Sequence, residues 1–258
     1  MADLYNILRN PKSPIIISKK RDFKASGIDL QFEDEALRRI AENAFLERTG
    51  ARGLVSAVEK VLIKFEHALP STDIHRLAVT AAMVADPAGE LEKILRNPND
   101  PEQKTRFQTL VAEEERELEE SIRLKENELL EGYGIYFSDH RRKLVTRRTI
   151  QGRMDLDSVV EDLVAVRQAA LDFAQAFSAR NEVQFGFAEE AIDLFAEKVW
   201  REGVDAGEVL KQSYHNYDHG LKLIREKTGV REFLVPPEGI ENPDGYLNQM
   251  IREIYKEE

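Results

Sequence analysis

The chain contains no cysteine in its 258 residues. Disulfide bonds, thiolate nucleophiles and thiolate zinc sites are therefore excluded, and we expect a cytoplasmic protein. Long apolar runs are also missing. No stretch of about 18 apolar residues is present, so we expect no membrane-spanning helix. The first residues lack the basic segment and apolar core that an export signal needs.

The chain has fewer basic than acidic residues. The 37 lysines and arginines are outnumbered by 48 aspartates and glutamates, which gives a formal net charge of −11. Binding to nucleic acid requires a basic face that neutralises phosphates, so we expect no nucleic-acid partner, although a local basic patch remains open. With 42% hydrophobic and 33% charged residues, the chain is expected to be a soluble globular protein of two domains.

Motifs for several kinds of catalysis are absent. No Gly-rich loop ends in Gly-Lys-Ser or Gly-Lys-Thr, which would bind nucleotide phosphates. No apolar strand ends in the paired acids that would hold magnesium. A Gly-x-Ser-x-Gly nucleophile elbow is missing as well. We therefore predict no catalytic residue in this chain.

Hydrophobic periodicity predicts two consecutive helices near the N-terminus, with Gly50 as the stop between them. The first, over 33–47, buries one apolar face: Ala36, Leu37, Ile40, Ala41, Ala44 and Phe45. The second, over 51–68, buries another: Leu54, Val58, Val61, Leu62 and Phe65. Ahead of them we predict a short helix over 3–9, closed by Asn10-Pro11, and an extended segment over 14–18.

Turn residues from Asp86 to Pro101 indicate a domain boundary. We predict a first domain over 1–85, a linker over 86–100 and a helical extension over 101–258, giving a mainly α protein with minor β structure. In the extension we expect one long helix over 102–131, whose Glu113-Glu114-Glu115 cluster lies on the outer side, either as a solvated face or as an acidic docking surface. The remaining predictions are a strand or aromatic plug at 132–137, helices at 156–177, 187–202, 207–227 and 244–256, and a loop at 236–239.

Two segments of the chain resemble each other. Val183-Gln184-Phe185 is similar to Leu30-Gln31-Phe32, and the helix after Phe187 parallels the helix after Phe32. In the helix alignment three pairs of positions coincide: Ala36 with Ala191, Phe45 with Trp200, and Arg52 with Gly207. Either 183–258 is a degenerate second copy of the first domain that has lost the arginine, or two amphipathic helices are alike by chance.

The turn between the first two helices, Thr49-Gly50-Ala51-Arg52-Gly53-Leu54, resembles the sensor-2 turn of ClpX-type AAA+ unfoldases. Other segments follow the order of the small domain in that family: Leu4 to Lys12 resembles its beginning, Leu30 to Ala41 the helix before the turn, Ala68 to Ser71 its closing segment, and 77–80 its short strand. The resemblance covers about residues 3–82.

This resemblance implies a small α/β lid domain over ATP and magnesium that are bound mainly by a large domain. Arg52 would contact the terminal phosphate, and Gly50, Ala51 and Gly53 would let the backbone approach the nucleotide. We expect the chain to be the C-terminal part of a longer ATPase, a chaperone that unfolds or remodels protein substrates as a hexamer, with a peptidase or an adaptor as candidate partner. On its own the chain is expected not to hydrolyse ATP.

The chemistry of arginine fits this role, because a guanidinium is always charged and holds two phosphate oxygens at once. The competing interpretation is a surface arginine that pairs with Glu47 or Glu59. Arg48 and Lys60 are lesser candidates for the same site. Two functions of other classes remain open: a non-catalytic interaction module that retains the lid fold, and a metal-dependent hydrolase in which His215 and His219 share a helix face.

Overall fold

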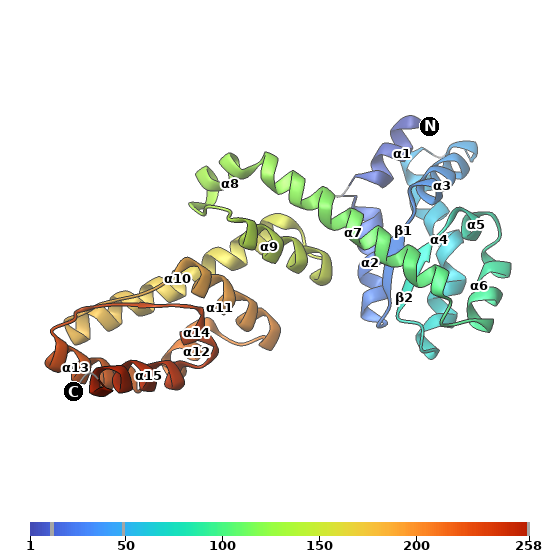
Figure 1. The fold of residues 1–258 in the computed structure, drawn as a ribbon. Helices are drawn as coiled ribbons and strands as arrows, with labels where there is room; N and C mark the ends of the chain where they lie inside the picture. The colour runs from blue at the N-terminus through green and yellow to red at the C-terminus, as the bar shows by residue number, and fades with distance from the viewer. Residues whose placement is uncertain (11–12, 48–49, 257–258) are drawn as a thin grey trace. The chain divides into compact units, whose positions relative to one another are not determined.

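The computed structural model describes residues 1–10, 13–47 and 50–256 (Figure 1). The described residues are mainly helical, with two small parallel sheets of two strands each, as the sequence predicts. They form two compact units, one of Met1–Ser121 with Arg148–Asp155 and one of Ile122–Arg147 with Leu156–Glu258. None of the helices described is both long and apolar enough to cross a bilayer.

The first sheet lies among short helices. The elements up to residue 96 are α1 (Ala2–Arg9), α2 (Pro14–Ala25), β1 (Asp29–Phe32), α3 (Asp34–Leu46), α4 (Ala51–Ala68), the 3-10 helix η1 (Leu69–Ser71), β2 (Arg76–Val79), α5 (Ala81–Ala85) and α6 (Pro87–Arg96). The predicted helices over 33–47 and 51–68 and the strand near 77–80 are confirmed. Residues 86–100, the predicted linker, include α6, whose Ile94 belongs to the core of this region.

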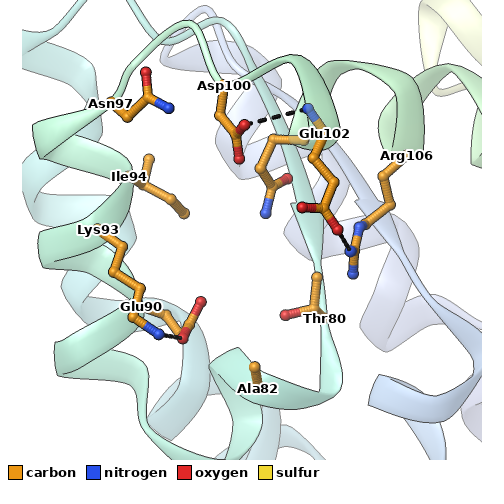
Figure 2. Close-up of a pocket in the computed structure, with 10 residues that line it drawn as sticks. Thr80, Ala82, Glu90, Lys93, Ile94, Asn97, Asp100, Glu102 and Arg106 are labelled. Carbon is orange, nitrogen blue, oxygen red and sulfur yellow. Dashed lines mark hydrogen bonds and ion pairs between the residues drawn. The ribbon is translucent and has the colours of Figure 1, made fainter.

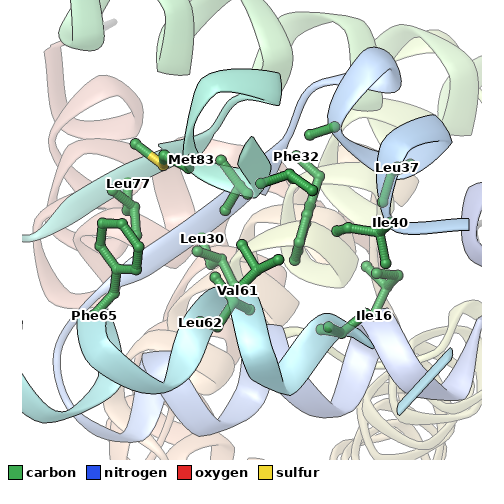
Figure 3. Close-up of a cluster of buried hydrophobic side chains, with 14 of the residues drawn as sticks. Ile16, Leu30, Phe32, Leu37, Ile40, Val61, Leu62, Phe65, Leu77 and Met83 are labelled. Atoms are coloured by element: carbon green, nitrogen blue, oxygen red, sulfur yellow. The ribbon is translucent and has the colours of Figure 1, made fainter. Parts of the chain in front are cut away.

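The core of this region lies on one face of the sheet (Figure 3). β1 and β2 are parallel, with Leu30 opposite Leu77 and Phe32 opposite Val79. Because side chains alternate along a strand, these four residues point to the same side, and they cluster with buried side chains of α3 and α4. Each fully buried Leu or Phe contributes about 1.5–3 kcal/mol, so this face holds the two helices in place.

Two details of the prediction for this region are wrong. Residues 14–18 are not extended but begin α2, because Pro14 occupies the first turn, where its missing N–H costs nothing. Helical spacing then buries Ile16, Lys20 and Phe23. Phe45 does not face the core: its side chain is 53% exposed, whereas the other five positions predicted for that face are buried.

The opposite face of the first sheet carries a polar network with α7 (Pro101–Leu124). Glu114 of α7 accepts hydrogen bonds from Lys20 Nζ (2.7 Å), Gln31 Nε2 (2.6 Å) and an Arg153 nitrogen (3.1 Å). Lys20 also donates to Gln31 Oε1 at 2.8 Å. The outer-side prediction is therefore wrong for Glu114, because these distant partners draw it inward.

Burial and charge act together on this network. Desolvation lowers the pKa of Lys20, although Glu114 opposes that effect. Burial would raise the pKa of the Glu114 carboxyl, but the charges of Lys20 and Arg153 and the hydrogen bonds from Lys20 and Gln31 outweigh burial and lower it. The ion pair of Glu114 with Lys20 fastens α7 to α2, and its hydrogen bond from Gln31 fastens α7 to β1.

The remaining elements are α8 (Glu126–Tyr133), α9 (Asp139–Gly152), α10 (Leu156–Asn181), β3 (Gln184–Phe187), α11 (Glu189–Glu202), α12 (Ala206–Ser213), α13 (Tyr217–Thr228), β4 (Glu232–Val235), α14 (Pro237–Glu241) and α15 (Pro243–Lys256). Three predictions need correction. The helix over 102–131 is interrupted at Lys125, the helix over 207–227 is interrupted at Tyr214–Asn216, and the loop at 236–239 contains the start of α14. Residues 135–137 form no strand, and both Ile135 and Phe137 are buried.

The second sheet repeats the hydrogen-bond pattern of the first. β3 and β4 are parallel, and the amide of Gln184 donates to the carbonyl of Arg231 at 2.7 Å. In the first sheet the amide of Asp29 donates to the carbonyl of His75 at 2.8 Å. In each region a strand is followed by helices, a parallel strand, a five-residue helix and a final helix. Asp86 and Asn242 begin the final helices, each accepting a hydrogen bond from the glycine amide three residues later.

This comparison changes one part of the internal alignment. If Ala36 is matched with Ala191, both of them fully buried, then Phe32 matches Phe187. Gln31 then matches Gly186. The strand similarity noted in the sequence, which pairs Gln31 with Gln184, is therefore two residues out of register with the helix alignment. Arg52 and Gly207 are each the second residue of the helix that follows, as the alignment predicts. That 183–258 is a second copy of the first domain stays a proposal.

Candidate functional site

The turn between α3 and α4 has the backbone that only glycine adopts readily. Gly50 has φ 63° and ψ −148°, in a region that other residues reach only under strain. The amide of Gly53, inside the first turn of α4, donates to the carbonyl of Gly50 at 3.0 Å. Arg48 and Thr49 lie outside the described residues. The glycine predicted to form this turn therefore does form it.

Arg52 lies on the surface in the first turn of α4. Among the described residues, none forms a hydrogen bond or an ion pair with its guanidinium. The two acids that sequence analysis offers as partners pair with lysines instead: Glu47 with Lys60 at 2.6 Å, and Glu59 with Lys19 at 3.9 Å. The simple surface pairing is therefore not formed, and Lys60 is neutralised by Glu47.

The start of α4 adds to this positive charge. No side chain caps the helix, because Gly50 stands at the N-cap. The first amides of a helix lack partners within the helix and carry a partial positive charge of roughly half a unit. Ala51 and Arg52 belong to this first turn. The site thus combines the Arg52 guanidinium with amides suited to an anion.

Exposed apolar side chains stand at the end of α3 and near the start of α4. Phe45 is 53% exposed, Leu46 is 77% exposed and Val55 is 44% exposed. A cavity of about 290 Å³ is lined in part by Leu46, Glu47 and Lys60. Large apolar side chains that are exposed close together are typical of a surface that another domain or molecule covers. Sequence periodicity placed Phe45 in the core, and only the structure shows that it belongs to this surface.

Residues 15–65 match the family described as the C-terminal, D2-small domain, of ClpB protein. The chain contains an AAA+ small domain. Over 79 residues it is 42% identical to the ATP-dependent Clp protease ATP-binding subunit ClpX of Borrelia duttonii, an alignment that covers 30% of this chain and 18% of that protein. The subunit of the same name from Treponema denticola is 42% identical over 69 residues, which are 27% of this chain and 17% of that protein.

ClpX 2 of Wolinella succinogenes is 32% identical over 99 residues, or 38% of this chain and 24% of that protein. The chain thus spans less than a quarter of the length of these three relatives. The AAA+ small domain includes the turn with Gly50, Ala51, Arg52 and Gly53, since these residues fall inside the matched range of 15–65.

A separate cavity of about 360 Å³ lies between the end of β2, α6 and the start of α7 (Figure 2). Its cations are already paired: Lys93 with Glu90 at 2.6 Å, and Arg106 with Glu102 at 2.8 Å. Arg106 also contacts Glu33 at 2.7 Å. The cavity therefore offers an anion no unpaired cation among its lining residues, and Arg52 does not line it.

The two histidines of the metal hypothesis do not share one helix. His215 lies in the interruption between α12 and α13, where its Nδ1 is 2.6 Å from the carbonyl oxygen of Gln212, and His219 lies in α13. The nearby carboxylate of Asp218 accepts hydrogen bonds from Arg180 (2.7 Å) and Asn181 (2.9 Å). In the part of the chain that the structure describes, no three acidic or histidine side chains are grouped as metal ligands.

Proposed function

We propose that Arg52 is the sensor-2 arginine of an AAA+ ATP site and that the small domain acts as a lid over the nucleotide. The observation that carries the proposal is the unpaired, exposed guanidinium at the uncapped start of α4, inside the family match. A planar guanidinium donates to two phosphate oxygens, and such charge-assisted bonds are about twice as strong as neutral ones.

In the proposed ATPase, ATP and magnesium are bound mainly by a large domain outside this chain. The lid closes over the phosphates, and Gly50, Ala51 and Gly53 keep the backbone close to them. Phe45, Leu46 and Val55 give the lid an apolar surface on which the large domain packs. Because the relatives are named as ATP-binding subunits of an ATP-dependent protease, we include in the proposal a cytoplasmic hexamer that unfolds or remodels protein substrates, with a peptidase or an adaptor as partner.

The test joins this chain to the nucleotide-binding large domain of a ClpX relative and measures ATP hydrolysis. Arg52→Ala should lower the rate about tenfold or more, since it removes charge-assisted contacts worth about 1.5–3 kcal/mol. Arg52→Lys should recover part of the loss, because it restores the charge but not the planar fork. Arg39→Ala is the matched control, since Arg39 is an exposed arginine of α3 that pairs with Glu35 at 3.5 Å.

Equal hydrolysis by the Arg52→Ala and Arg39→Ala fusions, with unchanged melting temperatures, would contradict the sensor-2 role. That result would favour the alternative, a non-catalytic interaction module that retains the lid fold.

A further inference from the structure

The outer edge of β4 has backbone groups that are free to pair. The bonds from the Gln184 amide to the Arg231 carbonyl and from the Ala188 amide to the Val235 carbonyl fix which residues of β4 face β3. In a parallel ladder the residues between them turn their amides and carbonyls to the other side. These residues are Glu232 and Leu234, and no third strand joins this sheet among the described residues. An open strand edge of this kind is a template for another chain.

A cavity lies against β4. A cavity of about 270 Å³ is lined by β4 and by Phe185 of β3, together with Tyr217 and Leu221 of α13 and Tyr246 and Met250 of α15. These two helices pack side by side in Figure 1. We call this cavity and the edge of β4 the β4 groove. Its walls are apolar and aromatic, which suits an aliphatic side chain.

The residues beside the groove are more exposed than their counterparts in the first sheet. Leu234 is 66% exposed and Val230, just before β4, is 45% exposed. In the aligned ladders Leu234 corresponds to Ala78, which is fully buried. The two sheets thus have the same topology, but β2 is covered by other elements at this position, whereas the corresponding residue of β4 is exposed.

Carboxylates lie at the groove. Glu232 lines it, and the charges of Glu238 and Glu253 reach Tyr246, whose pKa is raised by burial first and by these two carboxylates second. Among the described residues, none forms an ion pair with Glu232 or Glu238. A ligand for this groove gains from positive charge beside its apolar residues.

We infer that the β4 groove docks an extended segment of a partner protein, which pairs with β4 as a third strand, inserts an aliphatic side chain between α13 and α15, and presents lysine or arginine to the acidic rim. Recognition by strand addition takes affinity from main-chain hydrogen bonds and specificity from pockets for alternate side chains. This binding activity is independent of the ATP site proposed for Arg52, so the failure of one leaves the other standing.

The test uses the whole chain and a fluorescein-labelled nonapeptide with alternating valine and threonine, flanked by two lysines at each end. Fluorescence anisotropy should show saturable binding, and the same peptide flanked by glutamates should bind at least about tenfold more weakly. On binding, the amides of Glu232 and Leu234 should become protected from hydrogen exchange.

A pair of variants isolates the backbone contribution. Leu234→Pro removes the outward amide but none of the bonds to β3, so an edge strand tolerates it. It should weaken peptide binding about tenfold relative to Leu234→Ala, which loses the same side chain but keeps the amide.

Three results would overturn the inference: absence of binding by the lysine-flanked peptide, binding without protection of the two amides, or equal affinities for the two folded variants. Equal binding of the glutamate-flanked peptide would overturn the predicted basic character of the partner. If Leu234→Pro fails to fold, amide exchange in the unmodified chain decides the question alone.

Discussion

Residues 14–96 and 156–256 build two sheets of the same topology and differ at the start of one helix, α4 in the first region and α12 in the second. In the first region α4 starts without a side-chain cap and carries Arg52. In the second, Gly207 is the second residue of α12 and holds the matching position, and Asp205 caps the helix by accepting a hydrogen bond from the Glu208 amide at 2.9 Å. The apolar pattern and the turn residues thus determine the fold that the two regions have in common. The residue in the second position of the helix and the presence or absence of a side-chain cap determine the charge at the helix start.

The largest losses of unfolding free energy are expected from substitutions in the core of each region. Phe65→Ala and Phe177→Ala each remove a ring that is at most 1% exposed, and each should cost about 3–5 kcal/mol of unfolding free energy. Native-state hydrogen exchange should show the loss mainly in the unit that holds the variant. Equal loss of protection in both units would contradict separate cores.

The turn before α4, with Gly50, and the turn after α11, with Gly203, should differ in how well they accept a side chain. Gly50→Ala should cost about 1–3 kcal/mol, because the backbone at Gly50 is nearly restricted to glycine. Gly203→Ala should cost only about 1 kcal/mol, since Gly203 has φ 65° and ψ 36°, an ordinary left-handed conformation.

Gly132→Ala is the control for both glycine variants, because Gly132 lies inside α8 with open space around it. It should be neutral or stabilising by up to about 1 kcal/mol. Urea denaturation of the three variants measures their unfolding free energies and so tests the predicted order. If Gly203→Ala proved as destabilising as Gly50→Ala, the difference between the turns would be disproved.

The polar network under the first sheet should respond to acid. Glu114→Gln should lower the unfolding free energy at pH 7 by about 1–3 kcal/mol. The folded pKa of Glu114 is depressed, so its contribution is full above the unfolded value of about 4.3 and is lost as pH falls through the folded value. Urea denaturation between pH 7 and pH 3 should show the two proteins converging at the acid end. A constant difference would contradict the ion pair.

The smallest effect is expected at the cap of α12. Asp205→Ala should cost about 1 kcal/mol, because one amide of the first turn loses its acceptor. In the fusion with a large domain, it should leave ATP hydrolysis unchanged. A loss of hydrolysis comparable to that of Arg52→Ala would mean that the second region, too, acts at the nucleotide.

Local patterns predict the helices well, and partners far along the chain explain the errors. The apolar spacing from Leu54 to Phe65 is enough to predict α4 and its buried face. The run of isoleucines after Pro14 favours an extended segment locally, but the burial of Ile16 and Phe23 makes it a helix. Glu114 looks like part of a solvated acidic run because Lys20, its partner, lies 94 residues away.

The candidate site, too, is only partly predictable from local sequence. Gly50 and Arg52 are identifiable from sequence, since the turn follows from glycine and the flanking helices. That Glu47 and Glu59 pair with lysines, and so leave Arg52 unpaired, depends on how α2, α3 and α4 pack, which no local pattern encodes. The exposure of Phe45 follows from its place at the end of α3, just outside the buried stripe.

The most direct measurement is a structure of this chain joined to a ClpX-type large domain, determined with a non-hydrolysable ATP analogue and again with ADP. With the ATP analogue, two guanidinium nitrogens of Arg52 should lie within about 3 Å of the terminal phosphate oxygens. With ADP, those contacts should be absent. A guanidinium that pairs with a carboxylate of this chain in both states, away from the nucleotide, would contradict the account.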